Sequence, residues 1–298
     1  MPNFTMLAQN SDINYTKQAY LCALSIRATT PNSKICLITN DILDKKTASV
    51  FDDIIEIPWN DDAINSQWKI ENRWKIYHTC PYENTIVLDT DMLVLEDMTR
   101  WWNCLQDRDL FFTSKVLTYR GDEVTSVAYR KAFSVHNLPN IYSGFHYFKK
   151  TDETKYFFKW LETVMNNWEL FYGQFAGGKY FQKTPSIDLS AAIVTKILGL
   201  EEKITNKHID YPTFVHMKTQ CQDWKTPLSD KWQDIVGVYL NNDLELKIGN
   251  YRQQGVFHYT EDDFLTDNII KIYETYLGIT NDWRIILYSY KEVCILWR

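Results

Sequence analysis

The tripeptide Asp89-Thr90-Asp91 places two carboxylates between the short apolar runs at 86–88 and 92–95. Carboxylates beside buried strands are costly unless a cation or strong hydrogen-bond donors neutralise them. The first run is rich in β-branched residues, which predicts a strand buried in a mostly parallel sheet. Ligands of such sheets bind at the carboxyl ends of strands, and carboxylate oxygens suit Mg²⁺ or Mn²⁺. The pair therefore predicts a site for Mn²⁺ or Mg²⁺ with a diphosphate. The alternative is an acidic turn that caps a helix or pairs with lysines.

Further candidates for this site come from later in the chain. His216 and His258 each end a short apolar run, and either imidazole could complete a metal site or serve a structural role. Lys218 follows His216 closely and is a candidate phosphate contact. A helix is predicted to begin at Pro185, which places Asp188 in its first turn. There the carboxylate either complements the helix dipole or faces the active cleft.

Basic and aromatic candidates lie in the first eighty residues. A helix is predicted from Ser66 to Cys80, carrying Arg73 and Lys75 either toward the end of the strand before Asp89 or on a solvated face. Tyr15 is predicted to begin a helix that runs to about Arg27, with Asp12 or Asn14 as its N-cap. Its ring could stack on a nucleotide base, and a half-buried helix tyrosine is the favoured alternative.

The segment IYSGFHYF at 141–148 predicts a strand interrupted by Ser143-Gly144. A glycine within a strand often marks the close approach of a ligand or another backbone, and a bulge is the alternative. The stretch 114–139 shows little periodicity and predicts a long loop of the kind that covers an acceptor site. Further strands are predicted at 4–8, 35–38, 54–57 and 110–113, and further helices at 99–105, from Thr151, and directly after His258, where Thr260 and Asp263 resemble a capping box.

Composition narrows the class of protein. The 298 residues include 45% hydrophobic residues and carry a formal net charge of −6 without a sustained basic stripe, so no nucleic-acid partner is predicted. Neither G-x-G-x-x-G nor G-x-x-x-x-G-K-[ST] occurs, so metal and side chains must hold any phosphate. The six scattered cysteines, without a C-x-x-C pair, predict reduced thiols. With no signal peptide and no apolar stretch near the ~20 residues of a membrane span, a cytoplasmic location is predicted. Residues 282–298 predict an amphipathic helix docked on the domain, with peripheral membrane contact as the alternative.

The order of these pieces resembles the nucleotide-sugar glycosyltransferases of the GT-A fold, and among them glycosyltransferase family 8, the group of glycogenin and bacterial galactosyltransferases. Four segments within residues 4–150 carry the resemblance: the first strand with Asn14-Tyr15 and QAYLCALSI, the basic segment ENRWKI, the strand TIVLDTDMLVLEDM, and IYSGFHYF, where Tyr142 replaces the family's asparagine. The family's H-F-x-G-x-x-K-P-W ending is absent; the nearest segments are VHMKTQCQDW and VFHYTEDDF.

The resemblance implies an α/β GT-A fold with a mixed, mostly parallel sheet. It implies a catalytic domain over 1–260, with a nucleotide-binding half at 1–113 and an acceptor half at 114–260, and C-terminal helices packed on it over 261–298. The implied activity is transfer of a sugar from a nucleotide-sugar, here a UDP-sugar, to a hydroxyl acceptor, with retention and with Mn²⁺ or Mg²⁺.

The resemblance also implies roles for individual residues. Asp89 and Asp91 would hold the metal on the diphosphate, with His258 or alternatively His216 as the third ligand. Tyr15 would stack on uracil, while Arg73 and, more weakly, Lys75 would contact the donor. Ser143 and Gly144 would line the sugar pocket. Asp188 would stabilise the oxocarbenium-like transition state.

Two other functions remain open. The altered ending also fits a non-catalytic sugar-nucleotide-binding protein that kept the fold. An aspartate-nucleophile phosphatase also has a strand that ends in D-x-D, but that motif usually follows the first strand and continues with Thr or Val where this chain has Leu93.

Overall fold

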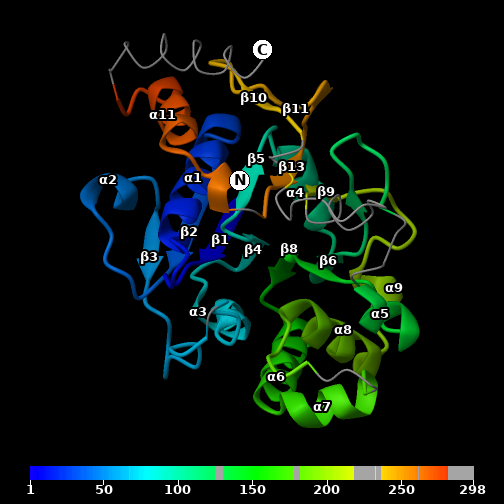
Figure 1. Ribbon diagram of the computed structural model, residues 1–298. Helices are drawn as coiled ribbons and strands as arrows, with labels where there is room; N and C mark the ends of the chain where they lie inside the picture. Colours follow the sequence, from blue (N-terminus) through cyan, green and yellow to red (C-terminus); the bar gives the residue numbers. More distant parts are fainter. Residues whose placement is uncertain are drawn as a thin grey trace.

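A six-stranded sheet forms the centre of the protein (Figure 1). The computed structural model describes residues 1–66, 68–124, 130–177, 182–217, 232, 236–260 and 262–280. The strand order is β3-β2-β1-β4-β8-β6. The first four strands are parallel, and β8 is antiparallel to both of its neighbours. The prediction of a mixed, mostly parallel α/β sheet is therefore confirmed.

The strands of this sheet are β1 (Asn3–Leu7), β2 (Lys34–Ile38), β3 (Asp53–Ile55), β4 (Asn84–Leu88), β6 (Leu110–Thr113) and β8 (Tyr142–Lys149). A four-stranded sheet in the order β5-β13-β9-β7 contains β5 (Met92–Val94), β7 (Val116–Leu117), β9 (Phe214–His216) and β13 (Val256–His258). A three-stranded sheet contains β10 (Val238–Leu240), β11 (Leu246–Ile248) and β12 (Tyr251–Arg252).

The helices are α1 (Tyr15–Thr29), α2 (Lys45–Ala48), α3 (Ile76–Thr79), α4 (Thr99–Leu105), α5 (Lys131–Val135), α6 (Asp152–Asn166), α7 (Trp168–Phe175), α8 (Ile187–Leu198), α9 (Glu201–Ile204) and α11 (Asp267–Tyr276). Two short 3₁₀ turns are η1 (Arg73–Lys75) and η4 (Asp262–Phe264). In Figure 1, α1 and α11 lie on one side of the central sheet, and α6, α7 and α8 lie on the other. None of the helices in the described ranges combines the length and the apolar character that crossing a bilayer requires.

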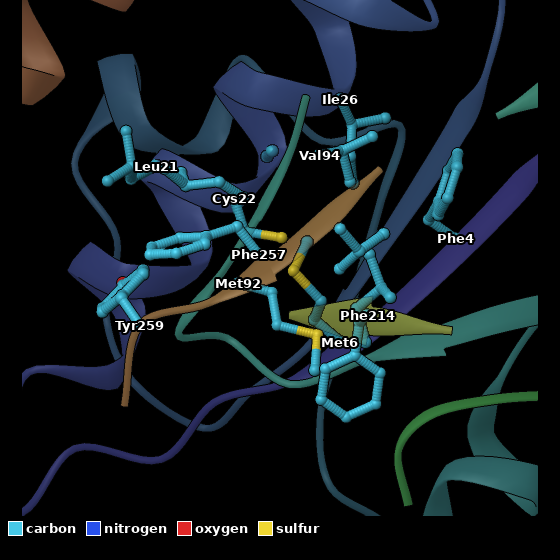
Figure 2. Packing of buried hydrophobic residues seen from close by; sticks show 14 of the residues in the cluster. Phe4, Met6, Leu21, Cys22, Ile26, Met92, Val94, Phe214, Phe257 and Tyr259 are labelled. Atoms are coloured by element: carbon cyan, nitrogen blue, oxygen red, sulfur yellow. The ribbon is translucent and has the colours of Figure 1, made fainter. Parts of the chain in front are cut away.

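Two hydrophobic clusters cover the two faces of the sheet, because successive side chains of a strand point to opposite faces. Met6 and Leu88 pack on one face with α1 and the β5–β13 pair, whereas Leu7 and Val87 pack on the other with α6 and α8. Figure 2 shows the first cluster, where Cys22 of α1 lies among side chains of β1, β5 and β13. This packing fixes both sheets against α1, and the side chain of Asn14 caps that helix by accepting the N–H of Lys17 at 2.9 Å.

The prediction of a helix from Ser66 to Cys80 is wrong for most of its length. Helical structure begins only with η1 and continues through α3. Lys69 has a positive φ of 52°, which an α-helix does not accommodate. Asn72 donates to Gln9 and to Asp61, at 2.7 and 2.6 Å from their side-chain oxygens. Hydrogen bonds between distant segments thus replace the helical ones, which sequence periodicity alone does not reveal.

Other element boundaries also differ from the predictions. The presumed loop at 114–139 contains β7 and α5, with 125–129 outside the described residues. Thr260 has a φ of 64° and does not cap a helix; α11 begins later, after its N-cap Thr266. The cap of α8 is Ser186, one residue beyond Pro185. The helix predicted over 282–298 lies outside the described residues.

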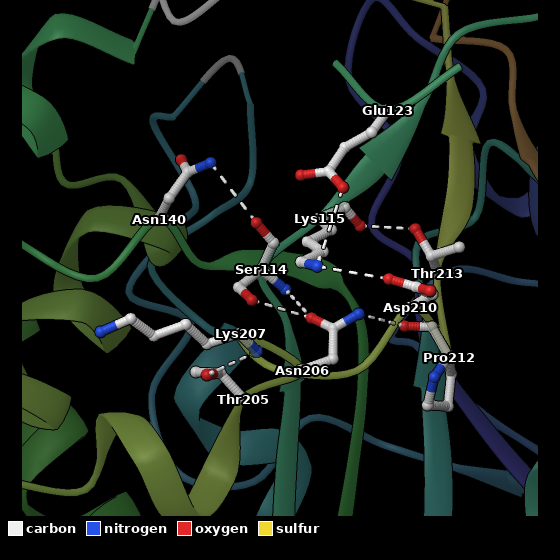
Figure 3. A network of polar contacts seen from close by, with 10 residues as sticks. All are labelled: Ser114, Lys115, Glu123, Asn140, Thr205, Asn206, Lys207, Asp210, Pro212 and Thr213. Atoms are coloured by element: carbon white, nitrogen blue, oxygen red, sulfur yellow. Dashed lines mark hydrogen bonds and ion pairs between the residues drawn. The ribbon is translucent and has the colours of Figure 1, made fainter. Parts of the chain in front are cut away.

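A polar network around Asn206 holds β9 beside the end of β6 (Figure 3). The side-chain oxygen of Asn206 accepts the backbone N–H of Ser114 at 2.7 Å and its hydroxyl at 2.8 Å. Its amide nitrogen donates to the carbonyl of Pro212, also at 2.8 Å. Asn206 is fully buried, so these groups depend on one another for hydrogen bonds. The network therefore fixes the segment that leads to His216.

We expect Asn206→Ala to lower the free energy of unfolding by about 1–3 kcal/mol, because it leaves buried donors and acceptors unsatisfied. Urea denaturation measures the change. Asn166→Ala, at an exposed position of α6, is the matched control and should stay within about 0.5 kcal/mol of the wild type. Equal losses in the two variants would contradict a structural role for the network.

Candidate active site

Asp89 and Asp91 directly follow β4, at the carboxyl end of the parallel strands. Thr90 between them is buried, and its hydroxyl donates to the side-chain oxygen of Gln18 on α1 at 2.9 Å. Because Thr90 points inward, the flanking aspartates are more open, with side chains 17% and 22% exposed. The D-x-D spacing thus places a partly exposed carboxylate on each side of the buried Thr90.

His258 reaches this pair through strand register. β13 runs antiparallel to β5, with His258 opposite Met92, the residue after Asp91. The backbone N–H of Tyr259 then donates to the carbonyl of Asp91 at 3.2 Å. The Nε2 atom of His258 lies 2.9 Å from Oδ2 of Asp91. Ligand atoms of Asp89, Asp91 and His258 all lie within 4.8 Å of one another, an arrangement that could hold a metal ion.

Each of the two aspartates has a basic side chain beside it. Arg73 forms an ion pair with Asp89. Burial opposes ionisation of Asp91, but the charge and hydrogen bond of His258, helped by Arg73, hold the pKa of Asp91 below its usual value. Burial likewise opposes protonation of His258, yet Asp91 raises the pKa of that imidazole. The guanidinium of Arg73 thus faces Asp89, and the imidazole of His258 faces Asp91.

Gly144 lies against Asp89. Its carbonyl accepts the backbone N–H of Asp89 at 2.9 Å. A Cβ atom at position 144 would lie 2.8 Å from Oδ2 of Asp89 and 2.9 Å from the Cε atom of Met92. The glycine in this strand therefore permits the close approach of a carboxylate.

Asp188 is held beside Ser143 at the start of β8. Oδ1 of Asp188 accepts the backbone N–H of Ser143 at 2.8 Å and also bonds its hydroxyl, while Oδ2 lies 2.8 Å from Arg130. Burial opposes ionisation of Asp188, but Arg130 and Ser143 outweigh it and lower the pKa of this carboxyl. The buried guanidinium of Arg130 lies over the rings of Tyr142 and Phe133, at 3.8 and 4.0 Å from their centroids. Sequence reasoning missed Arg130, because no local spacing connects it with a partner 58 residues away.

The remaining candidates occupy different places. Tyr15 begins α1 near the acidic pair; burial raises the pKa of Tyr15 to about 12, with Asp91 adding to the shift. The ring of His216 packs against that of His258, with centroids 4.7 Å apart, because the two histidines are register partners in β9 and β13. The buried ammonium of Lys75 binds Asp62 at 2.9 Å and the carbonyl of Asn60. Lys218 lies outside the described residues.

We expect Gly144→Ala to displace the Asp89 carboxylate and to weaken Mn²⁺ binding, since the added methyl group overlaps that oxygen. Overpacking should also destabilise the fold by about 1–3 kcal/mol. Electron paramagnetic resonance titration of free Mn²⁺ measures the affinity, and urea denaturation the stability. Gly173→Ala in α7 is the control, because its Cβ would meet nothing within 4 Å. Unchanged Mn²⁺ affinity in Gly144→Ala would contradict the steric role.

Comparison with known proteins supports the architecture. No family model matches the chain, and no curated protein sequence matches it. Among solved structures, it is similar to the galactosyltransferase LgtC in complex with donor and acceptor sugar analogues, at 13% identity and a TM-score of 0.53, over 95% of this chain and 99% of that one. A weaker similarity is to the glycosyltransferase GlyE of Streptococcus pneumoniae, at 14% identity and a TM-score of 0.46, over 98% of this chain and 63% of that one. The likeness to LgtC confirms the predicted fold: the chain has the GT-A fold of nucleotide-sugar glycosyltransferases.

Proposed function

We propose that the protein is a metal-dependent glycosyltransferase that moves a sugar from a UDP-sugar to a hydroxyl acceptor with retention. One observation carries the proposal: Asp89, Asp91 and His258 converge at the carboxyl end of β4 in a GT-A fold. Ligands of open α/β sheets bind at this edge. The galactosyltransferase LgtC, which has the same fold, was solved with donor and acceptor sugar analogues.

The three side chains that could bind a metal suit Mn²⁺ or Mg²⁺. Two carboxylates and one neutral imidazole provide hard oxygen ligands, a nitrogen ligand and two negative charges. Such a cation, when bound, stabilises the negative charge that grows on the leaving diphosphate. His258 would bind as the neutral imidazole, so protons would compete with the metal for this side chain. His216 would then orient His258 through ring packing without being a ligand.

Arg73 and Tyr15 would complete the donor site. Arg73 is already held beside Asp89, so its guanidinium adds a fixed positive charge where a diphosphate would lie. Tyr15 stands at the N-terminus of α1 within the field of Asp91, Asp89 and Arg73, and its ring would stack on uracil. We assign Lys75 no donor contact, because its ammonium is bound to Asp62. Any role of Lys218 stays a prediction.

Asp188 would act on the sugar rather than on the diphosphate. Arg130 and Ser143 keep this carboxylate ionised and fix its orientation. A fixed negative charge beside the reacting carbon would stabilise the oxocarbenium-like transition state. Ser143 and Gly144 would line the same pocket, since they connect Asp188 with Asp89 along β8.

A thermal-shift screen tests the donor site. We expect UDP-sugars to stabilise the protein in the presence of Mn²⁺, whereas GDP- and CDP-sugars should not. A donor at about 100 times its dissociation constant adds about 2.7 kcal/mol of stability. The shift should disappear in Asp91→Ala, which loses one of the three proposed metal ligands. Absence of any Mn²⁺-dependent shift in the folded wild-type protein would refute the donor site. A shift without sugar transfer to any hydroxyl acceptor would instead favour the non-catalytic binding protein.

A pair of variants separates the two histidines. We expect His258→Ala to weaken Mn²⁺ binding by about tenfold or more, because it removes a ligand. His216→Ala should weaken Mn²⁺ binding by less than His258→Ala does, because the ligand atoms that lie together are those of Asp89, Asp91 and His258. Isothermal titration calorimetry with Mn²⁺ measures both. The reverse order of effects would make His216 the ligand.

A further inference from the structure

A hollow of about 450 Å³ lies beside η1, apart from Asp89, Asp91 and His258. It is formed by the segment after β3, by η1 and α3, and by one residue of α6. Its principal side chains are aromatic or charged: Trp59, Trp74, His78, Asp62, Lys75 and Glu162. None of the roles proposed above uses this hollow.

Three aromatic rings make a platform in the hollow. Trp59 stacks on Trp74, with centroids 5.5 Å apart and planes 15° apart. His78 meets both indoles edge-on, at 5.5 and 5.8 Å. Trp74 is buried, whereas Trp59 remains 66% exposed. Trp59 therefore has one face on Trp74 and a large aromatic surface open to solvent.

The backbone of Trp59 is unusual. Its φ is 61°, in the left-handed region that bulky residues rarely adopt. Such conformations persist where the surrounding contacts hold them, and they concentrate at ligand-binding positions. An indole that is exposed and also held in a disfavoured conformation is better explained by a ligand than by the core.

Polar groups surround the platform. The ammonium of Lys75 is bound to Asp62, 2.9 Å away, and it approaches the ring of Trp74 to 5.5 Å. Glu162 contributes a second carboxylate from α6. The indole N–H of Trp74 is buried without a hydrogen-bond partner in the described part of the chain. The hollow thus offers carboxylates as hydrogen-bond acceptors beside an aromatic face, whereas the ammonium of Lys75 is 1% exposed and already bound.

This chemistry selects among ligand classes. Two carboxylates against one ammonium disfavour an anion such as a phosphate. The parallel contact between the two indoles leaves no aromatic cage between them for a quaternary ammonium group. A pyranose ring matches both features, because it has an apolar C–H face for the indole and a rim of hydroxyl groups that can donate to the carboxylates.

We propose that the Trp59 hollow is a second carbohydrate-binding site, which takes one ring of a neutral oligosaccharide with that ring stacked on Trp59. The site does not depend on the proposed transferase activity, because its side chains need neither metal nor nucleotide. It goes beyond that activity because the protein would bind a glycan at a second place, away from the site of sugar transfer.

Saturation-transfer NMR with maltohexaose, cellohexaose, chitohexaose and mannohexaose, without metal or nucleotide, tests the proposal. We expect at least one of these glucan, chitin or mannan probes to bind. Trp59→Ala should weaken binding about tenfold, the order expected for losing one stacked aromatic ring. Trp68→Ala is the matched control, because Trp68 is an exposed tryptophan (55%) that does not line the hollow. Asp91→Ala should bind like the wild type.

Glu162→Gln guards against misfolding of Trp59→Ala, because it leaves the rings in place and should still weaken binding several-fold. Circular dichroism of each variant confirms that it is folded. Binding of none of the four probes would overturn the proposal, as would equal binding by Trp59→Ala and the wild type. Loss of oligosaccharide binding in Asp91→Ala would assign the sugar to the donor site and would overturn the proposed second site. A negative result in the thermal-shift screen with nucleotide-sugars would by itself leave the second site intact.

Discussion

Neutralising two carboxylates at the end of a buried strand is the constraint on which the rest of the site depends. Asp89 and Asp91 follow β4, whose side chains are almost fully buried, so each carboxylate needs a cation or a strong hydrogen-bond donor. Arg73 provides a guanidinium beside Asp89, and His258 provides an imidazole nitrogen 2.9 Å from Asp91. The two partners come from opposite directions in the sequence, one before β4 and one near the end of the chain. The two carboxylates are therefore stabilised only when the whole domain has folded. The same arrangement brings possible metal-ligand atoms of Asp89, Asp91 and His258 within 4.8 Å of one another.

Strand register makes the arrangement precise. The pairing of Met92 with His258 fixes one side of the site, and the pairing of Leu88 with Phe145 places Gly144 against Asp89 on the other. A one-residue slip in the first pair would turn the side chain of His258 away, because successive side chains alternate between faces. A slip in the second pair would replace Gly144 by a residue whose Cβ collides with Asp89. Arg130 adds a third constraint by holding Asp188 against Ser143. Sites built on strands in this way are held more rigidly than sites on loops.

The sequence predicted the parts of the protein whose structure is locally determined. Residues 86–88 read as a buried strand because they are apolar and β-branched, and the Asp-Thr-Asp turn fell at its carboxyl end as expected. Asn14, one of the two predicted N-cap candidates, caps α1, and the apolar runs that end at His216 and His258 form β9 and β13. Long-range partners escaped prediction. Asn72 forms hydrogen bonds with Gln9 and Asp61 instead of continuing a helix, and Arg130 meets Asp188 only through tertiary folding. Periodicity carries no information about either contact.

Between Ser66 and Cys80, where a continuous helix was predicted, the short turn η1 contributes side chains to two different places. In η1, with about three residues per turn, successive side chains point roughly 120° apart. Arg73 consequently reaches Asp89, while Trp74 and Lys75 line the Trp59 hollow. The loop that carries Trp59 is tied to the same framework, since Asp62 pairs with Lys75 and Asp61 accepts from Asn72. Asn72 in turn donates to Gln9, two residues beyond β1. The polar contacts of Asn72 and Lys75 thus hold the loop that carries Trp59, and Arg73 between them pairs with Asp89, so one short segment borders both the hollow and the acidic pair.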